Sequence, residues 1–281
     1  MSICAFPLIP SNVNTSLSMK KAAFSLFTLM LAVCVSFAGK DILELKGGKG
    51  PGKGKTIVLV SGDEEYRTEE SMPMLAKILS QKHGFDCIVL FAWDKEGKYI
   101  DPNNQAGIKG WKHLDGADLM LTGTRFRRPS AEDAKHITAF LDAGKPIIGI
   151  RTSTHAFTGG GSFGSKISYG SFGPLVMGDG WVSHHGGHKS QGARGMIEKA
   201  NAKHPILQGV KDVFGPSDVY GIRKVTPERD TILLRGAVTK TLDPKSPNVE
   251  GKKNDPMQPL AWLHPYESSA GKKGTTFCTT M

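Results

Sequence analysis

Apolar runs of five or six residues recur along the chain, separated by longer segments that carry polar residues. The runs at 56–60 (TIVLV), 87–91 (CIVLF), 117–122 (ADLMLT) and 146–150 (PIIGI) are nearly continuous. A strand buried on both faces shows this pattern, whereas a strand with one solvated face alternates apolar and polar positions. The four runs therefore predict four buried strands.

Two segments between these runs show helical periodicity. Residues 70–82 place apolar side chains three and four positions apart, with Pro73 in the expected first turn and Gly84 at the end. A second helix is expected to begin after the capping residue Ser130 and to end at Gly144. Shorter apolar runs predict later strands at 195–198, 231–236, 260–263 and 275–280.

The alternation of strands and helices predicts an α/β fold, in which helices cover both faces of a doubly wound, mostly parallel sheet. Residues 151–204 are rich in Gly, Ser and His and lack periodicity. So long an irregular segment inside a compact domain usually carries function. Because such a fold normally ends with a covering helix, we also expect the native chain to extend beyond Met281.

The first 38 residues are typical of an extension followed by a secretory signal peptide. Lys20 and Lys21 precede an apolar run at 22–35, and small residues lead to Ala38. The run is short for a membrane span, although an uncleaved anchor is the alternative. We expect cleavage near Ala38, a periplasmic or secreted protein, and no stable membrane insertion after cleavage.

Composition divides the rest of the chain into a linker and one domain. Residues 39–54 form a Gly/Lys-rich segment that predicts a flexible linker, and residues 55–281 form the α/β domain. The formal net charge is +10, but many of the lysines lie in segments with loop composition and no nucleic-acid motif accompanies them. We therefore expect no nucleic-acid partner.

Polar residues follow three of the predicted strands at the point where each ends. They are Glu64, Glu65, Arg125, Arg151, Thr154 and His155. In open α/β sheets, ligands bind beyond the carboxyl ends of the strands, so we expect a cleft for a polar ligand there. His155 is the acid–base candidate, with Glu64 or Glu65 as its carboxylate partner. Arg125 and Arg151 are the expected substrate clamps.

Three histidines, His184, His185 and His188, fall within five residues. Neutral imidazoles suit zinc and similar metals, and Asp179 is a carboxylate that could complete such a site. The intervening glycines disfavour a helix that would place the histidines on one face. The alternative is that one or two of them hydrogen-bond a sugar or the backbone and the rest are solvated.

Asp218 and Tyr220 alternate along an apparent strand and are expected to share one face. They either line the cleft or brace it. Trp181 and Tyr220 are aromatic residues that could stack on a sugar ring.

Several motifs in combination resemble the ThuA-like (trehalose-utilisation) proteins of the class I glutamine amidotransferase-like superfamily. The closest resemblance is to signal-peptide-bearing members from planctomycete-type bacteria, over roughly residues 55–281. The motifs are DEEYR at 63–67, TRFR at 124–127, IGIRTSTHAF at 148–157, HHGGH at 184–188, HPI at 204–206 and DVY at 218–220. The resemblance implies a flavodoxin-like sheet and a role in carbohydrate metabolism. Many members carry a histidine where Arg151 stands here.

Glutaminases of this superfamily present a cysteine nucleophile at the exit of the fourth strand. No cysteine lies between Cys87 and Cys278, so glutaminase chemistry is excluded. Ser153 or Thr154 with His155 as base is an alternative, although the Gly-x-Ser-x-Gly elbow is missing.

These observations predict an exported protein that acts on a sugar or an oxidised sugar as a hydrolase or isomerase. Its expected partner is a small-molecule carbohydrate, and no organic cofactor is implied. One alternative is a non-catalytic carbohydrate-binding module on the same fold. Another is a metal-dependent hydrolase that uses the histidine cluster with zinc or a similar divalent metal.

Overall fold

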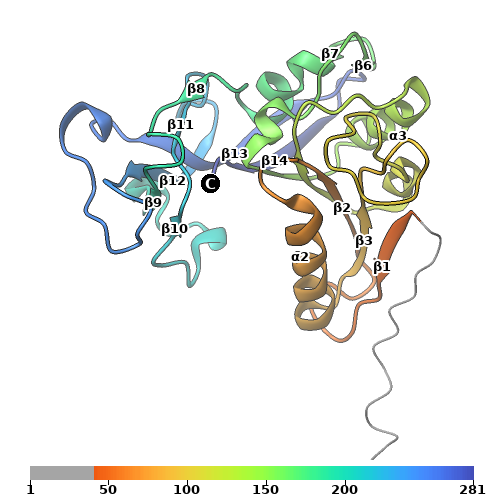
Figure 1. Ribbon diagram of the computed structural model, residues 1–281, viewed down its shortest axis with the longest axis horizontal. Helices are drawn as coiled ribbons and strands as arrows, with labels where there is room; N and C mark the ends of the chain where they lie inside the picture. Colours follow the sequence, from red (N-terminus) through yellow and green to blue (C-terminus); the bar gives the residue numbers. More distant parts are fainter. Residues whose placement is uncertain (1–40) are drawn as a thin grey trace, which may run out of the picture. The chain divides into compact units, whose positions relative to one another are not determined.

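One mixed sheet of ten strands organises the described chain. The computed structural model describes residues 41–281, so the predicted signal peptide at 1–38 lies outside them. The strand order is β1-β3-β2-β4-β5-β14-β13-β12-β9-β10, and Figure 1 shows the strands with the helices around them. Two further pairs of short strands stand apart from this sheet.

Five neighbouring strands in the centre of the sheet are parallel. They are β3 (Asp86–Leu90), β2 (Thr56–Gly62), β4 (Leu119–Thr124), β5 (Ile147–Ile150) and β14 (Lys273–Thr279). The four predicted strands correspond to β2, β3, β4 and β5. The predicted α/β fold with parallel central strands is confirmed.

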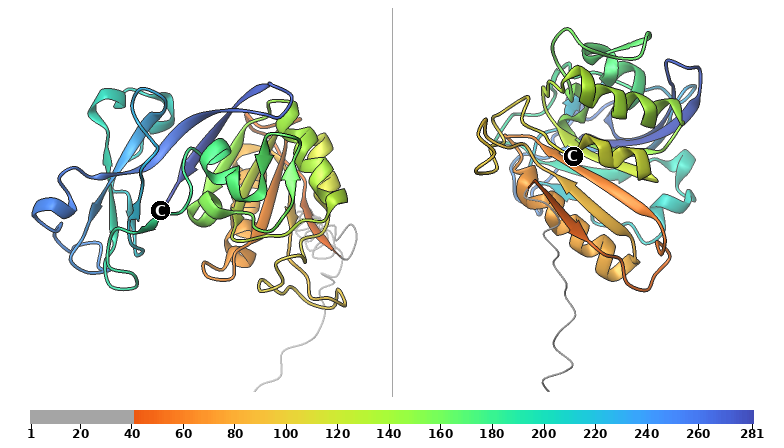
Figure 2. Two further views of the ribbon diagram at one scale, coloured as in Figure 1. Left: turned by 90° about the horizontal axis from the view of Figure 1, so that it is seen from above. Right: turned by 90° about the vertical axis from the view of Figure 1, so that its right-hand side faces the viewer.

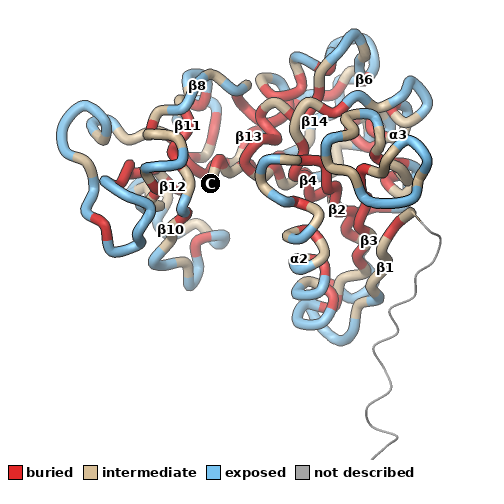
Figure 3. The backbone as a smooth tube through the Cα atoms, viewed as in Figure 1, coloured by how far each residue is buried: buried red, intermediate tan, exposed pale blue. Residues whose placement is uncertain are grey.

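Helices on both faces explain why these strands are apolar throughout. The two long helices are α2 (Thr68–His83) and α3 (Ala131–Asp142). In β2, Ile57 and Leu59 belong to the apolar cluster on the α2 face, whereas Val58 and Val60 belong to the cluster on the α3 face. Successive side chains of a strand point to opposite faces, so both sets must be apolar. Figure 2 shows the two helices on opposite sides of the strands, and Figure 3 shows the buried residues concentrated in the sheet.

Beyond β14 the sheet continues as antiparallel strands. They are β13 (Gln258–Glu267), β12 (Thr231–Val238), β9 (Ala193–Ile197) and β10 (Phe214–Gly215). The predicted later strands overlap β9, β12, β13 and β14. The sequence did not indicate the direction of pairing. Residues 268–272 join β13 to β14, and so short a connection permits only an antiparallel pair.

The predicted flexible linker at 39–54 is wrong in its described part. β1 (Ile42–Leu45) pairs antiparallel with β3 at the edge of the sheet. The backbone N–H of Gly47 donates to Asp86 Oδ1 at 2.8 Å, and a Cβ at Gly47 would lie 2.1 Å from the carbonyl oxygen of Gly84. The glycines therefore permit close packing of the chain rather than flexibility.

Both helices are close to their predicted bounds. α2 begins at Thr68, two residues earlier than predicted, so Pro73 lies in the second turn and not in the first. Gly84 ends this helix with a φ of 80°. Ser130 caps α3 as predicted, because its hydroxyl accepts the backbone N–H of Asp133 at 3.1 Å.

Short elements connect the longer ones, and several of them fall in residues 151–204, which the sequence marked as irregular. The short strands are β6 (Ser162–Phe163), β7 (Ile167–Ser168), β8 (Ser183–His184) and β11 (Tyr220–Gly221). The single helical turns are η1 (Trp111–Gly116), η2 (Arg151–His155), η3 (Tyr169–Ser171), η4 (Gly173–Met177), η5 (Lys199–Asn201), η6 (Pro205–Leu207) and η7 (Gly251–Lys253). Across residues 41–281, no helix combines the length and apolarity needed to cross a membrane.

A buried pair, Asp230 and His264, ties the long strand β13 to the turn η4. His264 Nδ1 lies 2.7 Å from Asp230 Oδ1, and its Nε2 lies 3.3 Å from the carbonyl oxygen of Leu175. The backbone N–H of Thr226 donates to the other carboxylate oxygen at 3.0 Å. Burial by itself would raise the pKa of Asp230, but these hydrogen bonds hold it below its usual value.

We predict that Asp230→Ala lowers the free energy of unfolding by about 3 kcal/mol, because it leaves the buried imidazole without its partner. Urea denaturation followed by circular dichroism measures this change. Glu250→Ala is the control, since it removes an exposed carboxylate and should change stability by less than about 0.5 kcal/mol. Equal effects of the two substitutions would contradict the prediction.

Candidate active site at the ends of the parallel strands

Three parallel strands end side by side, and their exit loops touch. Gly62 of β2 pairs with Thr124 of β4, and the backbone N–H of Arg125 donates to the Gly62 carbonyl oxygen at 2.9 Å. The N–H of Phe126 donates to the His155 carbonyl oxygen at 3.0 Å, which joins the exit of β4 to the turn η2 after β5. The structure thus brings the predicted residues of all three exits together.

The backbone is strained along this edge. Among residues 41–281, five non-glycine residues have positive φ, and three of them follow the strand ends: Arg67, Phe126 and Arg151, at 50°, 51° and 48°. A fourth, Lys189, follows the histidine cluster. Each such residue costs roughly 1–3 kcal/mol and persists only where the surroundings hold it. Such strain is typical of functional sites.

Glu64 is held by two arginines from the exit of β4. Arg125 Nη1 donates to one carboxylate oxygen, and Arg127 Nη2 donates to the other at 2.7 Å. Arg127 is 1% exposed and also donates to three backbone carbonyl oxygens. Arg125 is the more exposed of the two, at 28%, and lies 3.4 Å from Glu65 Oε2 through its Nε. Arg125 is therefore the arginine of this group that can reach a ligand.

Asp63 fastens the exit of β2 to the exit of β5. Its Oδ1 accepts the backbone N–H groups of Glu65 and Tyr66 at 2.8 and 3.3 Å. Its Oδ2 accepts the hydroxyl of Thr152. Burial raises the pKa of the Asp63 carboxyl above its ordinary value, and these hydrogen bonds oppose that shift.

Arg151 is a buried brace in this structure. The side chain is 3% exposed, and its Nη1 donates to the carbonyl oxygens of Asp218 and Thr280 at 2.6 Å each. Its Nη2 donates to Asp218 Oδ1 at 3.0 Å and to the Tyr66 hydroxyl at 2.9 Å. The guanidinium carbon lies 3.8 Å from the centre of the Tyr220 ring. These contacts leave no donor of Nη1 or Nη2 for a substrate, so the predicted clamp role does not fit.

Asp218 forms hydrogen bonds to two histidines of the loop at residues 184–188, which we call the histidine loop. The residue is fully buried; His184 Nδ1 lies 2.8 Å from its Oδ2, and His188 Nδ1 lies 3.2 Å from its Oδ1. Burial would raise the pKa of Asp218, but the histidine hydrogen bonds and the charge of Arg151 hold it below its usual value. A Cβ at Gly186 would lie 3.2 Å from the Cβ of Asp218, so a small residue lets the loop wrap tightly.

Backbone pairing fixes this loop to the strand that carries Asp218. His184 in β8 is the partner of Tyr220 in β11, and the N–H of Gly186 donates to the Val219 carbonyl oxygen at 3.0 Å. His188 then reaches back to the exit of β2, where its Nε2 lies 3.5 Å from Glu65 Oε1. The histidine loop and the strand exits therefore share one site.

Three aromatic side chains surround His155 at this edge of the sheet. The ring centres of Phe126, Trp181 and Tyr220 lie 5.0, 5.8 and 6.3 Å from that of His155. Its Nδ1 lies 3.2 Å from the Thr154 hydroxyl, and its Nε2 has no hydrogen-bond partner among residues 41–281. Burial, together with the nearby charges of Arg125 and Arg151, lowers the pKa of His155 to about 3. The ring is therefore neutral near pH 7.

Trp181 is the exposed aromatic of the site. It is 44% exposed, and its ring centre lies 5.7 Å from that of His184. Tyr220, by contrast, is 2% exposed and lies beneath Arg151. Of the two aromatic residues proposed from the sequence to stack on a ligand, only Trp181 is open to solvent.

Three residues considered from the sequence lie apart from the chemistry. His185 Nε2 lies 2.7 Å from the Lys253 carbonyl oxygen, so His185 does not join His184 and His188. Asp179 accepts the backbone N–H of Arg223 at 2.6 Å, so Asp218 takes the place expected for it. The Ser153 hydroxyl donates to a carbonyl oxygen of β4 at 2.8 Å, which argues against a serine nucleophile.

Sequence reasoning missed three contributors: Tyr66, Asp63 and Arg127. Each lies in a motif that was recognised, directly after a strand. Their neighbours were chosen instead because a sequence does not show which polar side chains turn inward. The exposure of each side chain in the structure distinguishes the buried residues that support the site from those that a ligand can reach.

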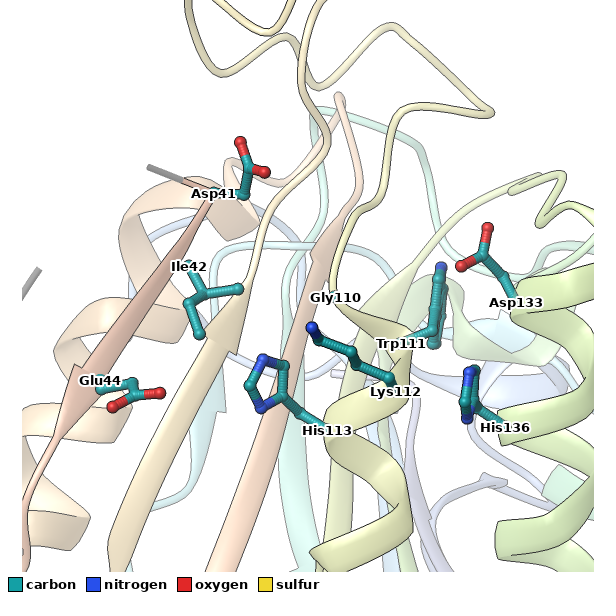
Figure 4. A pocket seen from close by; sticks show the side chains of 9 residues that line it. All are labelled: Asp41, Ile42, Glu44, Gly110, Trp111, Lys112, His113, Asp133 and His136. Atoms are coloured by element: carbon teal, nitrogen blue, oxygen red, sulfur yellow. The ribbon is translucent and has the colours of Figure 1, made fainter. Parts of the chain in front are cut away.

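A separate cavity of about 480 Å³ lies between β1, η1 and α3. Figure 4 shows the residues that line it, among them Glu44, Trp111, His113 and His136. It contains none of the strand-exit residues, so it is distinct from the candidate site.

We predict that His155 makes stability depend on pH. Its folded pKa of about 3 lies below the ordinary value, so the unfolded chain binds the proton more readily. The neutral ring makes its full contribution to the free energy of unfolding above about pH 6.5, and this contribution is lost as the pH falls towards 3. When the pH is lowered from 7.5 to 5.0, the free energy of unfolding of wild type should therefore fall by up to about 2 kcal/mol more than that of His155→Asn. Urea denaturation at the two pH values measures this difference. Identical losses would contradict the low pKa.

No protein-family model matches this sequence, and no curated protein matches it. Among solved structures, the chain is similar to a protein designated ThuA-like from Bacteroides uniformis, with 11% identity, a TM-score of 0.48 and coverage of 83% of each chain. It is also similar to a protein designated ThuA-like from Parabacteroides merdae, with 13% identity and a TM-score of 0.49. That match covers 81% of this chain and 79% of the other.

Proposed function

We propose that the chain is an exported ThuA-like protein that acts on a sugar or an oxidised sugar at the ends of its parallel strands. The observation that carries the proposal is the exposed ring of Trp181 beside the neutral imidazole of His155. The motifs around these residues are those that resemble ThuA-like proteins.

Trp181 supplies an apolar surface for the sugar. A carbohydrate ring presents an apolar face of C–H groups and a rim of hydroxyls, so it needs a flat apolar partner bordered by polar groups. The Trp181 ring lies next to both His155 and His184, with ring centres 5.8 and 5.7 Å away. Imidazole nitrogens can donate or accept, which suits hydroxyl groups.

His155 acts in its neutral form. A pKa of about 3 makes it a poor general acid and a weak base, since efficient proton transfer needs a pKa near the working pH. A neutral imidazole can nevertheless hydrogen-bond a hydroxyl or polarise a carbonyl group. We assign His155 to a substrate oxygen, with Arg125 as the accessible cation nearby.

A non-catalytic carbohydrate-binding module is the second candidate. The chain has no cysteine at the exit of β5, and the Ser153 hydroxyl is bound to backbone carbonyl oxygens. A site with aromatic and hydrogen-bonding groups, in which neither a cysteine nor Ser153 can serve as the nucleophile, suits recognition. Calorimetry that detects a sugar, together with mass spectrometry that detects no product, would favour this candidate.

We predict that Trp181→Ala weakens sugar binding about tenfold, because it removes the stacking surface, which is worth up to about 1.5 kcal/mol. Calorimetric titration with disaccharides and their keto forms measures the affinity. Ile206→Ala is the matched control, since Ile206 is also 44% exposed but lies on η6. An unchanged affinity in Trp181→Ala would remove the stacking role.

His155→Asn separates the two candidates. Under the enzymatic proposal it lowers turnover of the bound sugar by about 100-fold, the low end of what one positioned polar group contributes. Under the binding-module proposal neither protein forms a product. Product formation by His155→Asn at the wild-type rate would exclude His155 from the reaction.

We propose export on the sequence alone. N-terminal sequencing of the protein recovered from a bacterial periplasm should begin at Gly39, after cleavage at Ala38. A chain that keeps its first 38 residues would contradict this proposal.

A further inference from the structure

We propose that His184, His188 and Glu65 bind one divalent metal ion of the zinc type, and that Asp218 orients the two histidines without binding the ion. The inference is independent of the proposed function, because it concerns only the affinity of these side chains for a metal. His184, His188 and Asp218 each offer a possible ligand atom within 4.8 Å of the others, and Glu65 adds a carboxylate oxygen 3.5 Å from His188 Nε2.

The two imidazoles are oriented by one carboxylate. Both Nδ1 atoms lie at hydrogen-bond distance from Asp218, at 2.8 and 3.2 Å, and the ring centres are 4.3 Å apart. An ionised carboxylate only accepts, so each Nδ1 must carry its proton, and in a neutral ring the lone pair is then on Nε2. Histidines that bind metals commonly donate the other ring N–H to a carboxylate in this way.

Asp218 is poorly placed to be a ligand itself. Its Oδ1 already faces the guanidinium of Arg151 at 3.0 Å and His188 Nδ1 at 3.2 Å. Its Oδ2 faces His184 Nδ1. A metal ion on these oxygens would displace the imidazoles and lie against a buried positive charge.

Glu65 is the carboxylate on the other side of the His188 ring. Its Oε1 lies 3.5 Å from His188 Nε2, which carries the available lone pair. Two atoms that bind zinc at about 2.0–2.2 Å in tetrahedral geometry lie roughly 3.3–3.6 Å apart. The distance between Glu65 and His188 therefore matches that between two ligands of one ion.

Accessibility agrees with this assignment. The side chains of His184, His188 and Glu65 are 36%, 31% and 31% exposed, whereas Asp218 is fully buried. Three protein ligands leave a position open for water or a substrate oxygen, as in catalytic zinc sites. An ion held there would polarise an oxygen next to Trp181.

Calorimetric titration of the chelator-treated mature protein with zinc chloride tests the assignment. We expect one zinc ion per chain. Asp218→Asn should weaken the affinity 10- to 100-fold, as loss of an outer partner does, and loss of a ligand in Glu65→Gln or His184→Gln should weaken it about 100-fold or more. His185→Ala is the matched control in the same loop, and its affinity should equal that of wild type.

Two results would overturn the proposal. One is wild-type protein that binds no zinc in the titration. The other is Glu65→Gln with wild-type affinity, which would mean that Glu65 is not a ligand of the ion. Circular dichroism melting checks that each variant folds, and His188→Gln replaces His184→Gln should the latter unfold. Zinc binding without turnover of any sugar would support this inference and contradict the enzymatic function.

Discussion

The arrangement of the site depends on the buried pair of Arg151 and Asp218. Arg151 occupies the turn after β5 with a φ of 48°, a conformation that an arginine does not adopt without support. Its guanidinium reaches the side chain and the carbonyl oxygen of Asp218 and the carbonyl oxygen of Thr280, beyond the end of β14. A buried ion pair of this kind often adds little net stability, but removing one partner leaves an uncompensated charge. The pair therefore specifies geometry: it joins the parallel strands to the segment that carries the histidines.

This constraint assigns different tasks to neighbouring residues. Four residues are nearly fully buried and form their hydrogen bonds with other groups of the protein: Arg151, Asp63, Arg127 and Asp218. Arg125, Glu65, His184, His188 and Trp181 remain accessible on the same edge. The turn after β5 is occupied by Arg151, whose side chain points inward. The strained turn after β5 thus supports a hydrogen-bonding site.

The sequence predicted the central strands, both long helices and the edge where the polar residues gather, because these follow from periodicity and from the rule that parallel strands end together. It did not predict the antiparallel pairing of β12 and β13, since short apolar runs do not show strand direction. The linker prediction failed because composition alone cannot show that Gly47 packs against Gly84. At the site, His184 and His188 were recognised, but their carboxylate partner lies 30 or more residues away, and only tertiary structure pairs them with Asp218. Likewise, nothing in the sequence distinguishes buried Arg151 from accessible Arg125.

A double-mutant cycle on Arg151 and Asp218 measures directly whether the two side chains are energetically coupled. The free energy of unfolding would be measured for wild type, Arg151→Met, Asp218→Asn and the double variant by urea denaturation. If the pair joins the strand exits to the histidine loop, the coupling energy should be about 2 kcal/mol, and the double variant should lose less than the sum of the two single variants. Additive losses, with a coupling energy near zero, would mean that this pair does not join the strand exits to the histidine loop.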